Sequence, residues 1–269
     1  MQEKSTGSYE EIIRNLPSHL HLSTYKDSIK KLHEIIDLLG MRYNGIKYTG
    51  IKELDPFNLY ATQPVLESDK LGLVLYLVLF KKYDVPVIVI YNSRGEYYIL
   101  DGHHRARVHI WLRKKLPAHL IHVPAYKPKI SNPLCITEVI NPPSGTPEEI
   151  LPLRHMVNTI VFLEKMHGII ARIWREKPLI KILRPTQPPS EILGIHDEMH
   201  SSLPILVYDY LGSKYVVDGH KRTCKALLQG IDKIKAITFT LHTYIGLIRV
   251  CEYIGYESFD EKYCRAEER

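Results

Sequence analysis

Two short segments place an aspartate, a glycine and a run of basic residues directly after a predicted strand. They are Asp101-Gly102-His103-His104-Arg105 and Asp218-Gly219-His220-Lys221-Arg222. A helix that begins there, with the aspartate as its N-cap, points unpaired backbone N–H groups at any ligand, with the positive end of its dipole behind them. The glycine allows close approach of the backbone, and the basic side chains add donors and charge. We therefore predict an anion site, with phosphate as the natural ligand.

The two segments belong to a longer internal duplication. Asp101 follows Gly95 at the same interval at which Asp218 follows Gly212, and both glycines lie in predicted turns. A Thr-Gln-Pro triplet precedes each copy, at residues 62–64 and 186–188. Repetition of several features in the same order predicts two related subdomains.

The elements that must position these residues follow from the apolar pattern. In each copy we expect a helix, a hairpin of two short strands, the Asp-Gly-His turn, a second helix and a returning strand. In the first copy the helices are expected over 69–82 and from residue 102 to about 112, and the strands over 87–90, 97–100 and 118–123.

The expected fold class is α+β, with two repeats and additional helices. We expect an N-terminal helical extension over residues 1–46, capped by Ser23 or Thr24, and a first repeat over 47–124. A proline-rich connector should span 125–178 and include a helix from Thr146 to about Trp174. A second repeat should span 179–269 and include a C-terminal helix from roughly Thr243 to Ile254.

The order of strand, Asp-Gly-His-His-Arg and helix resembles the ParB/sulfiredoxin superfamily. The resemblance covers Leu54 to Val123 and, more loosely, Ile182 to Phe239. In that superfamily the corresponding turn holds nucleotide phosphates. The two-part chain is most similar to the archaeal free serine kinases, which use ATP or ADP and magnesium to convert L-serine to O-phospho-L-serine for cysteine biosynthesis. The resemblance therefore implies a kinase whose partners are L-serine and an adenine nucleotide.

The resemblance also implies roles for particular residues. Phosphoryl transfer needs a phosphate cradle, a metal, an oriented nucleophile and usually a carboxylate near the hydroxyl. Residues 101–105 would form the cradle, and Asp101 would hold Mg²⁺ or accept the serine proton. The family's upstream catalytic glutamate is not in register, because Thr62-Gln63-Pro64 takes its place. Of the nearest carboxylates, Glu67 and Asp69, we predict Glu67 as the second catalytic residue, which orients or deprotonates the serine hydroxyl.

Two copies allow a division of labour. We expect one complete site, in the first copy, because it alone carries the full Asp-Gly-His-His-Arg turn. The second copy keeps a potential phosphate site at Asp218, Gly219, His220, Lys221 and Arg222.

The residues of the turn and the chain after it bear on two neighbouring functions of the superfamily. Sulfiredoxin chemistry needs a cysteine in the turn, where this chain has His103 or His220. A ParB-like nucleic-acid-binding protein is the alternative, although about 30 residues follow Phe239, which is short for a helix-turn-helix domain. A focused cleft at Asp101 would favour the kinase, and an extended basic stripe would favour nucleic acid.

Composition sets broad limits on function. The 269 residues carry a formal charge of +6, which permits anionic partners. No apolar run approaches the roughly 20 residues of a membrane span, and the N-terminus lacks a signal-peptide core. The four cysteines form no CxxC pair, which disfavours a zinc knuckle or a dense disulfide framework and favours the cytoplasm. Abundant Ile, Tyr, Lys and Glu indicate a thermophilic source.

Overall fold

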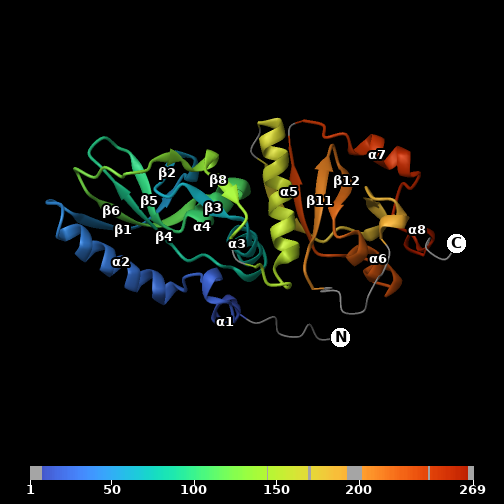
Figure 1. The fold of residues 1–269 in the computed structure, drawn as a ribbon, viewed down its shortest axis with the longest axis horizontal. Coiled ribbons are helices and arrows are strands. Elements are labelled where there is room, and N and C mark those ends of the chain that lie inside the picture. The colour runs from blue at the N-terminus through green and yellow to red at the C-terminus, as the bar shows by residue number, and fades with distance from the viewer. Residues whose placement is uncertain (1–7, 144, 169–170, 193–201, 242, 266–269) are drawn as a thin grey trace. The chain divides into compact units, whose positions relative to one another are not determined.

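The chain divides into two compact units. A computed structural model describes residues 8–143, 145–168, 171–192, 202–241 and 243–265. The units are Met1–Val157 and Asn158–Arg269. Each contains helices and a mixed sheet, so the predicted α+β class is confirmed at that level (Figure 1).

A six-stranded sheet forms the centre of the first unit. Its order is β1 (Lys47–Leu54), β6 (Leu116–His122), β4 (Val87–Tyr91), β5 (Tyr97–Asp101), β2 (Leu59–Ala61) and β7 (Asn132–Pro133). β4 is parallel to β6 and antiparallel to β5, while β2 is parallel to β5. Two further short strands, β3 (Val65–Glu67) and β8 (Glu138–Ile140), pair with each other.

The second unit contains a five-stranded sheet. Its order is β9 (Arg172–Glu176), β13 (Ala236–Thr240), β11 (Ile205–Tyr210), β12 (Ser213–Asp218) and β10 (Leu183–Arg184). β11 is parallel to β13 and antiparallel to β12, and β10 is parallel to β12. This order matches β1-β6-β4-β5-β2 of the first unit, strand for strand, in both pairing direction and chain order.

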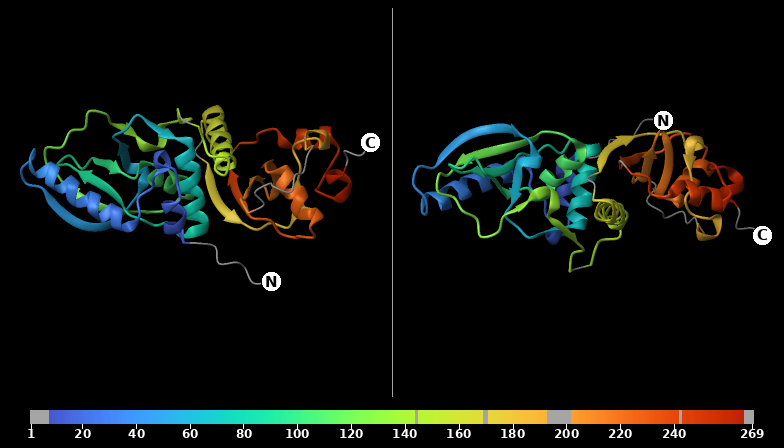
Figure 2. Two further views of the ribbon diagram at one scale, coloured as in Figure 1. Left: turned by 60° about the horizontal axis from the view of Figure 1, so that its bottom comes forward. Right: turned by 90° about the horizontal axis from the view of Figure 1, so that it is seen from above.

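Helices cover both faces of the first sheet. α2 (Tyr25–Gly40) begins at Thr24, whose side chain forms a capping box with Asp27. Leu32 and Leu39 of α2 pack against Ile88 and Ile90, which point to one face of β4. α3 (Ser68–Lys81) and α4 (His103–Leu112) pack against each other (Figure 2). α1 (Tyr9–Arg14) precedes α2.

The second unit fills the space beside its Asp-Gly-His helix with the C-terminal part of the chain. α6 (His220–Leu228) packs against α8 (Glu261–Cys264), and Phe259 and Tyr263 are buried with Ile205 and Val216 in one core. A further helix, α7 (Leu247–Ile254), lies between β13 and α8 in the chain.

The structure corrects three expectations about the chain between and beyond the repeats. The helix expected from Thr146 to Trp174 is α5 (Leu151–His167), and Trp174 lies in β9, where it pairs with Thr238 of β13. The expected connector is therefore not a separate segment, because β7 and β8 pair with strands of the first unit and β9 closes the second sheet. The C-terminal helix, expected from Thr243, begins at Leu247. In the described part of the chain, no helix has the length and apolarity needed to cross a membrane.

A disulfide joins Cys224 of α6 to Cys264 of α8, which the cysteine spacing did not reveal. The bond links positions 40 residues apart. Closing a loop of that length stabilises a fold by about 2–4 kcal/mol.

We expect a dithiol reductant to lower the thermal unfolding midpoint of the second unit's transition by several degrees, measured by calorimetry. The Cys224→Ser/Cys264→Ser variant should start at the lower midpoint and should not respond to the reductant, and an equal response from both proteins would contradict the expectation.

Candidate functional site

A β-bulge and a glycine shape the turn between β5 and α4. Ile88 pairs with Asp101 and Val89 pairs with Ile99, so Leu100 is an extra residue in β5. Bulges of this kind re-aim neighbouring side chains, and Leu100 and Asp101 both line the same pocket. Gly102 follows with φ of 93°, and a Cβ there would lie 2.4 Å from Val87. Only glycine fits this position.

The N-terminus of α4 is open. The sequence predicted that Asp101 caps this helix, but it does not. Gly102 is the N-cap residue, and no side chain caps the first N–H groups of the helix. The carboxylate of Asp101 instead accepts hydrogen bonds from Arg105 Nη2, at 2.7 Å, and from Lys31 Nζ. Burial alone would raise the pKa of Asp101, but Arg105 and Lys31 outweigh it and hold the pKa below its ordinary value. Asp101 is therefore an anion between two cations.

Arg105 is buried, and its guanidinium group donates hydrogen bonds to other groups of the protein. Nη1 donates to the carbonyl oxygens of Val85 and Pro86, at 2.9 and 3.0 Å. Nη2 holds Asp101. Arg105 contributes positive charge to the pocket, and its hydrogen bonds fix the loop before β4 and the orientation of Asp101.

The two histidines of the turn are neutral and serve as acceptors. Nε2 of His103 accepts the Thr62 N–H at 3.1 Å, and Nε2 of His104 accepts the Glu67 N–H at 3.0 Å. Burial lowers the pKa of His103 to about 4 and that of His104 to about 3. Both rings therefore carry their proton on Nδ1 near neutral pH. They anchor the chain before α3 to the start of α4.

Glu67 lies beside the pocket and does not line it. Its carboxylate forms an ion pair with Lys70, with Oε2 and Nζ 2.7 Å apart. Lys70 itself lines the pocket. The neighbouring Asp69 is fully buried and accepts a hydrogen bond from Thr146 at 2.6 Å, so it holds the segment before α5 and has no place in the pocket.

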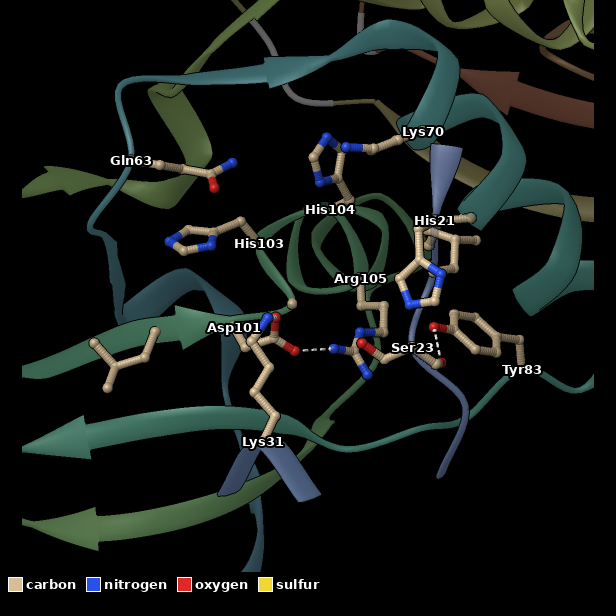
Figure 3. A pocket seen from close by; sticks show the side chains of 14 residues that line it. His21, Ser23, Lys31, Gln63, Lys70, Tyr83, Asp101, His103, His104 and Arg105 are labelled. Carbon is tan, nitrogen blue, oxygen red and sulfur yellow. Dashed lines mark hydrogen bonds and ion pairs between the residues drawn. The ribbon is translucent and has the colours of Figure 1, made fainter. Parts of the chain in front are cut away.

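The residues of the turn, from Asp101 to Arg105, help to line a pocket of about 300 Å³. Figure 3 shows Gln63, Lys70, His103 and His104 on one side of the α4 N-terminus and Lys31, Asp101, Ser23 and Tyr83 on the other. The remaining lining residues are His21, Leu22, Val74, Leu100, Gly102 and Arg105. Three cationic side chains and an open helix N-terminus thus surround one carboxylate, which is an arrangement suited to an anion.

The residues of this pocket do not fit a resident magnesium site. Asp101 is the one carboxylate among its lining residues, and both of its oxygens are paired with cations. Among the described residues, no group of three or more His, Cys, Asp or Glu side chains is placed to hold a metal ion. Magnesium usually binds through one or two carboxylates together with substrate phosphates. The paired carboxylate of Asp101 therefore does not by itself supply a magnesium site.

The second Asp-Gly-His turn repeats the polar frame of the first. His220 Nε2 accepts the Thr186 N–H at 2.9 Å, as His103 accepts that of Thr62. Arg222 pairs with Asp218 at 2.7 Å, and β12 carries the same bulge before Asp218. Gly219 has φ of 99° and is an uncapped N-cap like Gly102. The two turns are therefore built by the same local bonds.

The surroundings of the second turn differ from those of the first. The Phe259 ring lies 5.8 Å from that of His220, and the Tyr263 hydroxyl donates to the Gln187 carbonyl at 2.7 Å. Gln63, the counterpart of Gln187, lines the pocket of the first unit. The C-terminal segment thus packs against two residues whose counterparts line the first pocket. Lys221 stands where the first turn has His104.

Sequence reasoning identified the turn and missed the residues that complete the pocket. The structure brings Asp101, Gly102, His103, His104 and Arg105 together and leaves the carboxylate of Glu67 outside the lining. The residues that sequence reasoning did not identify include Lys31, Lys70, His21, Ser23 and Tyr83. Lys31 lies in the N-terminal extension, so that segment forms part of the site.

The neutral histidines predict a pH dependence of stability. Between pH 6.5 and about 4 the unfolded chain binds protons at these histidines and the folded chain does not, so the free energy of unfolding falls as the pH falls. Each such group contributes up to about 1.4 kcal/mol per pH unit. We expect urea unfolding of His104→Gln, which keeps an acceptor for the Glu67 N–H, to show a shallower slope than the wild type over this range. Equal slopes would show that the pKa of His104 is the same in the folded and the unfolded chain.

Comparisons with protein-family models, with curated proteins and with solved structures returned no match to this chain.

Proposed function

We propose that the first unit binds the phosphates of ATP or ADP at the N-terminus of α4 and transfers the terminal phosphoryl group to free L-serine. The observation that carries this proposal is the pocket itself, in which Lys31, Lys70 and Arg105 surround Asp101 at an uncapped helix N-terminus. Such a site stabilises the charge on a transferring phosphoryl group. Its focused shape is the arrangement expected for a nucleotide, and it favours the kinase over the nucleic-acid alternative.

The finer fold assignment is part of the same proposal. Two ParB/sulfiredoxin-like repeats would share a strand order, a bulge before the aspartate and a glycine-led helix. The sheets of the two units agree in strand order and in these turn features, which supports the assignment. The second repeat would be closed by its own C-terminal segment and would leave catalysis to the first.

In the proposed reaction the serine hydroxyl oxygen attacks the terminal phosphorus, and the bond from that phosphorus to the bridging oxygen breaks. The products are O-phospho-L-serine and the nucleotide shortened by one phosphate. The hydroxyl proton passes to the carboxylate of Asp101, the one acid that lines the pocket. Because the transition state for phosphoryl transfer is loose, orientation of the hydroxyl matters more than the basicity of its acceptor.

The two lysines have separate parts in this scheme. Lys31 is paired with Asp101, and an arriving phosphate would compete for its ammonium and free one carboxylate oxygen. Lys70 is paired with Glu67, so Glu67 holds a phosphate-binding lysine in place. The proton acceptor role predicted for Glu67 passes in this proposal to Asp101, because Glu67 does not line the pocket.

The test is incubation of the protein with magnesium, ATP or ADP, and a panel of free amino acids, followed by mass detection of phosphorylated products. We expect O-phospho-L-serine with at least one of the two nucleotides, and at least about 100-fold slower formation of it in the Asp101→Asn variant. Phosphorylation of a different amino acid would rule out L-serine as the substrate. Nucleotide binding without any product would rule out the proposed kinase activity.

A further inference from the structure

A second, apolar pocket lies beside the cationic one in the first unit. Its volume is about 260 Å³, and its walls come from the C-terminal half of α2, the residues just after that helix, Leu100 and Tyr126. Leu38, Leu39 and Tyr43 supply apolar and aromatic surface, and Arg42 is its one charged lining residue. The proposed phosphoryl transfer leaves this pocket unused.

The two pockets share lining from two elements of the fold. Leu100 lines both, and it is the extra residue of the bulge in β5, directly before Asp101. α2 also lines both, with Lys31 at the cationic pocket and Leu39 at the apolar one. Eight residues of helix separate these positions by about 12 Å. A ligand that reaches from one pocket to the other would lie along α2, with an anionic end and an apolar end.

The apolar pocket has the character of a site for a flat aromatic group. The rings of Tyr43 and Tyr126 lie 6.0 Å apart and are tilted by 56°. Leu38, at its rim, is 58% exposed although it is apolar. Stacking on tyrosine rings and contact with leucine side chains remove such a group from water.

We infer that this pocket holds the base of the nucleotide whose phosphates bind at the N-terminus of α4. The inference rests on the proposed function and adds the direction in which the nucleotide lies. The phosphates contact Lys31 and the turn at Gly102, the sugar passes Leu100, and the base lies between the C-terminal half of α2 and Tyr126. The ligand class is a nucleoside di- or triphosphate, recognised at its base by apolar contact.

Calorimetric titration with ATP and with inorganic tripolyphosphate separates the two pockets. Tripolyphosphate carries the phosphates without a base. The test variant is Leu38→Asn, at a rim position whose exposure lets the helix fold. The matched control is Met41→Asn, at the residue that directly follows the same helix, because Met41 is 81% exposed and does not line the pocket.

We expect Leu38→Asn to weaken ATP binding about five-fold or more and to leave tripolyphosphate binding at the wild-type level. Met41→Asn should change neither. Wild-type ATP affinity in Leu38→Asn, with tripolyphosphate still bound, would overturn the base site and leave the phosphate site standing. Failure of the wild-type protein to bind either ligand would overturn the proposed function and the base site together.

Discussion

Replacing Asp101 with asparagine is expected to reduce phosphoryl transfer to serine by about 100-fold or more. Asp101 is the one carboxylate that lines the cationic pocket, and the amide would keep the shape of the side chain while losing its charge and its capacity to take a proton. Single-turnover kinetics with saturating nucleotide measure the loss directly, because they separate the chemical step from binding.

Asp218→Asn is the matched control for this substitution. Asp218 forms the same ion pair with Arg222, at 2.7 Å, that Asp101 forms with Arg105, so both variants lose an equivalent structural contact. We expect Asp218→Asn to retain most of the activity. An equal loss from both variants would show that the two turns act together or that both are active.

Removing either lysine of the pocket should weaken ATP binding about ten-fold or more, since a hydrogen bond to a charged group contributes about 1.5–3 kcal/mol. The variants are Lys31→Met and Lys70→Met, which keep an unbranched side chain and remove the ammonium group. Both lysines pair with carboxylates and line the pocket, so their charge lies where the phosphates would bind. Calorimetry at fixed ionic strength gives the affinities.

Lys30→Met is the control variant, because it removes one positive charge from α2 outside the pocket. The Lys30 side chain is 79% exposed and pairs with Glu34 on the surface of α2. We expect its variant to bind ATP as the wild type does. If all three variants weaken binding equally, the effect is one of net charge and the pocket has no special part in it.

The local structure of the turn could be predicted from sequence because its causes are local. A strand, a glycine that must adopt positive φ and a run of helix-forming basic residues define the geometry within a few positions, and Gly102 and Gly219 both show it. The expected hairpin and the following helix also depend on short-range patterns, and both are present in the structure.

The partners of Asp101 could not be predicted because they come from elsewhere in the fold. The local sequence predicted that Asp101 caps the helix. In the structure its carboxylate instead accepts hydrogen bonds from Arg105, one turn later, and from Lys31, 70 residues earlier. Lys31 has an ordinary place on an amphipathic helix, and nothing in its neighbours marks it as part of a site. Lys70 is hidden in the same way, in the first turn of α3.

The errors in the second half of the chain have the same origin. The apolar residues of α5 continue to Trp174 in sequence, yet the helix ends at His167 and Trp174 joins a strand that pairs with β13. Cys224 and Cys264 meet because α8 packs against α6, which no spacing rule reveals. Each error concerns a pairing between elements that are distant in sequence, which a local pattern does not encode.

Amide-resolved hydrogen exchange with and without ATP tests most directly which turn binds the nucleotide. In the proposed function the backbone N–H groups at the start of α4, and not those at the start of α6, bind the nucleotide phosphates. We predict that ATP slows exchange of the amides of residues 102–105 and leaves those of residues 219–222 unchanged. Protection confined to 219–222, or no protection at either turn under conditions where ATP binds, would contradict the account.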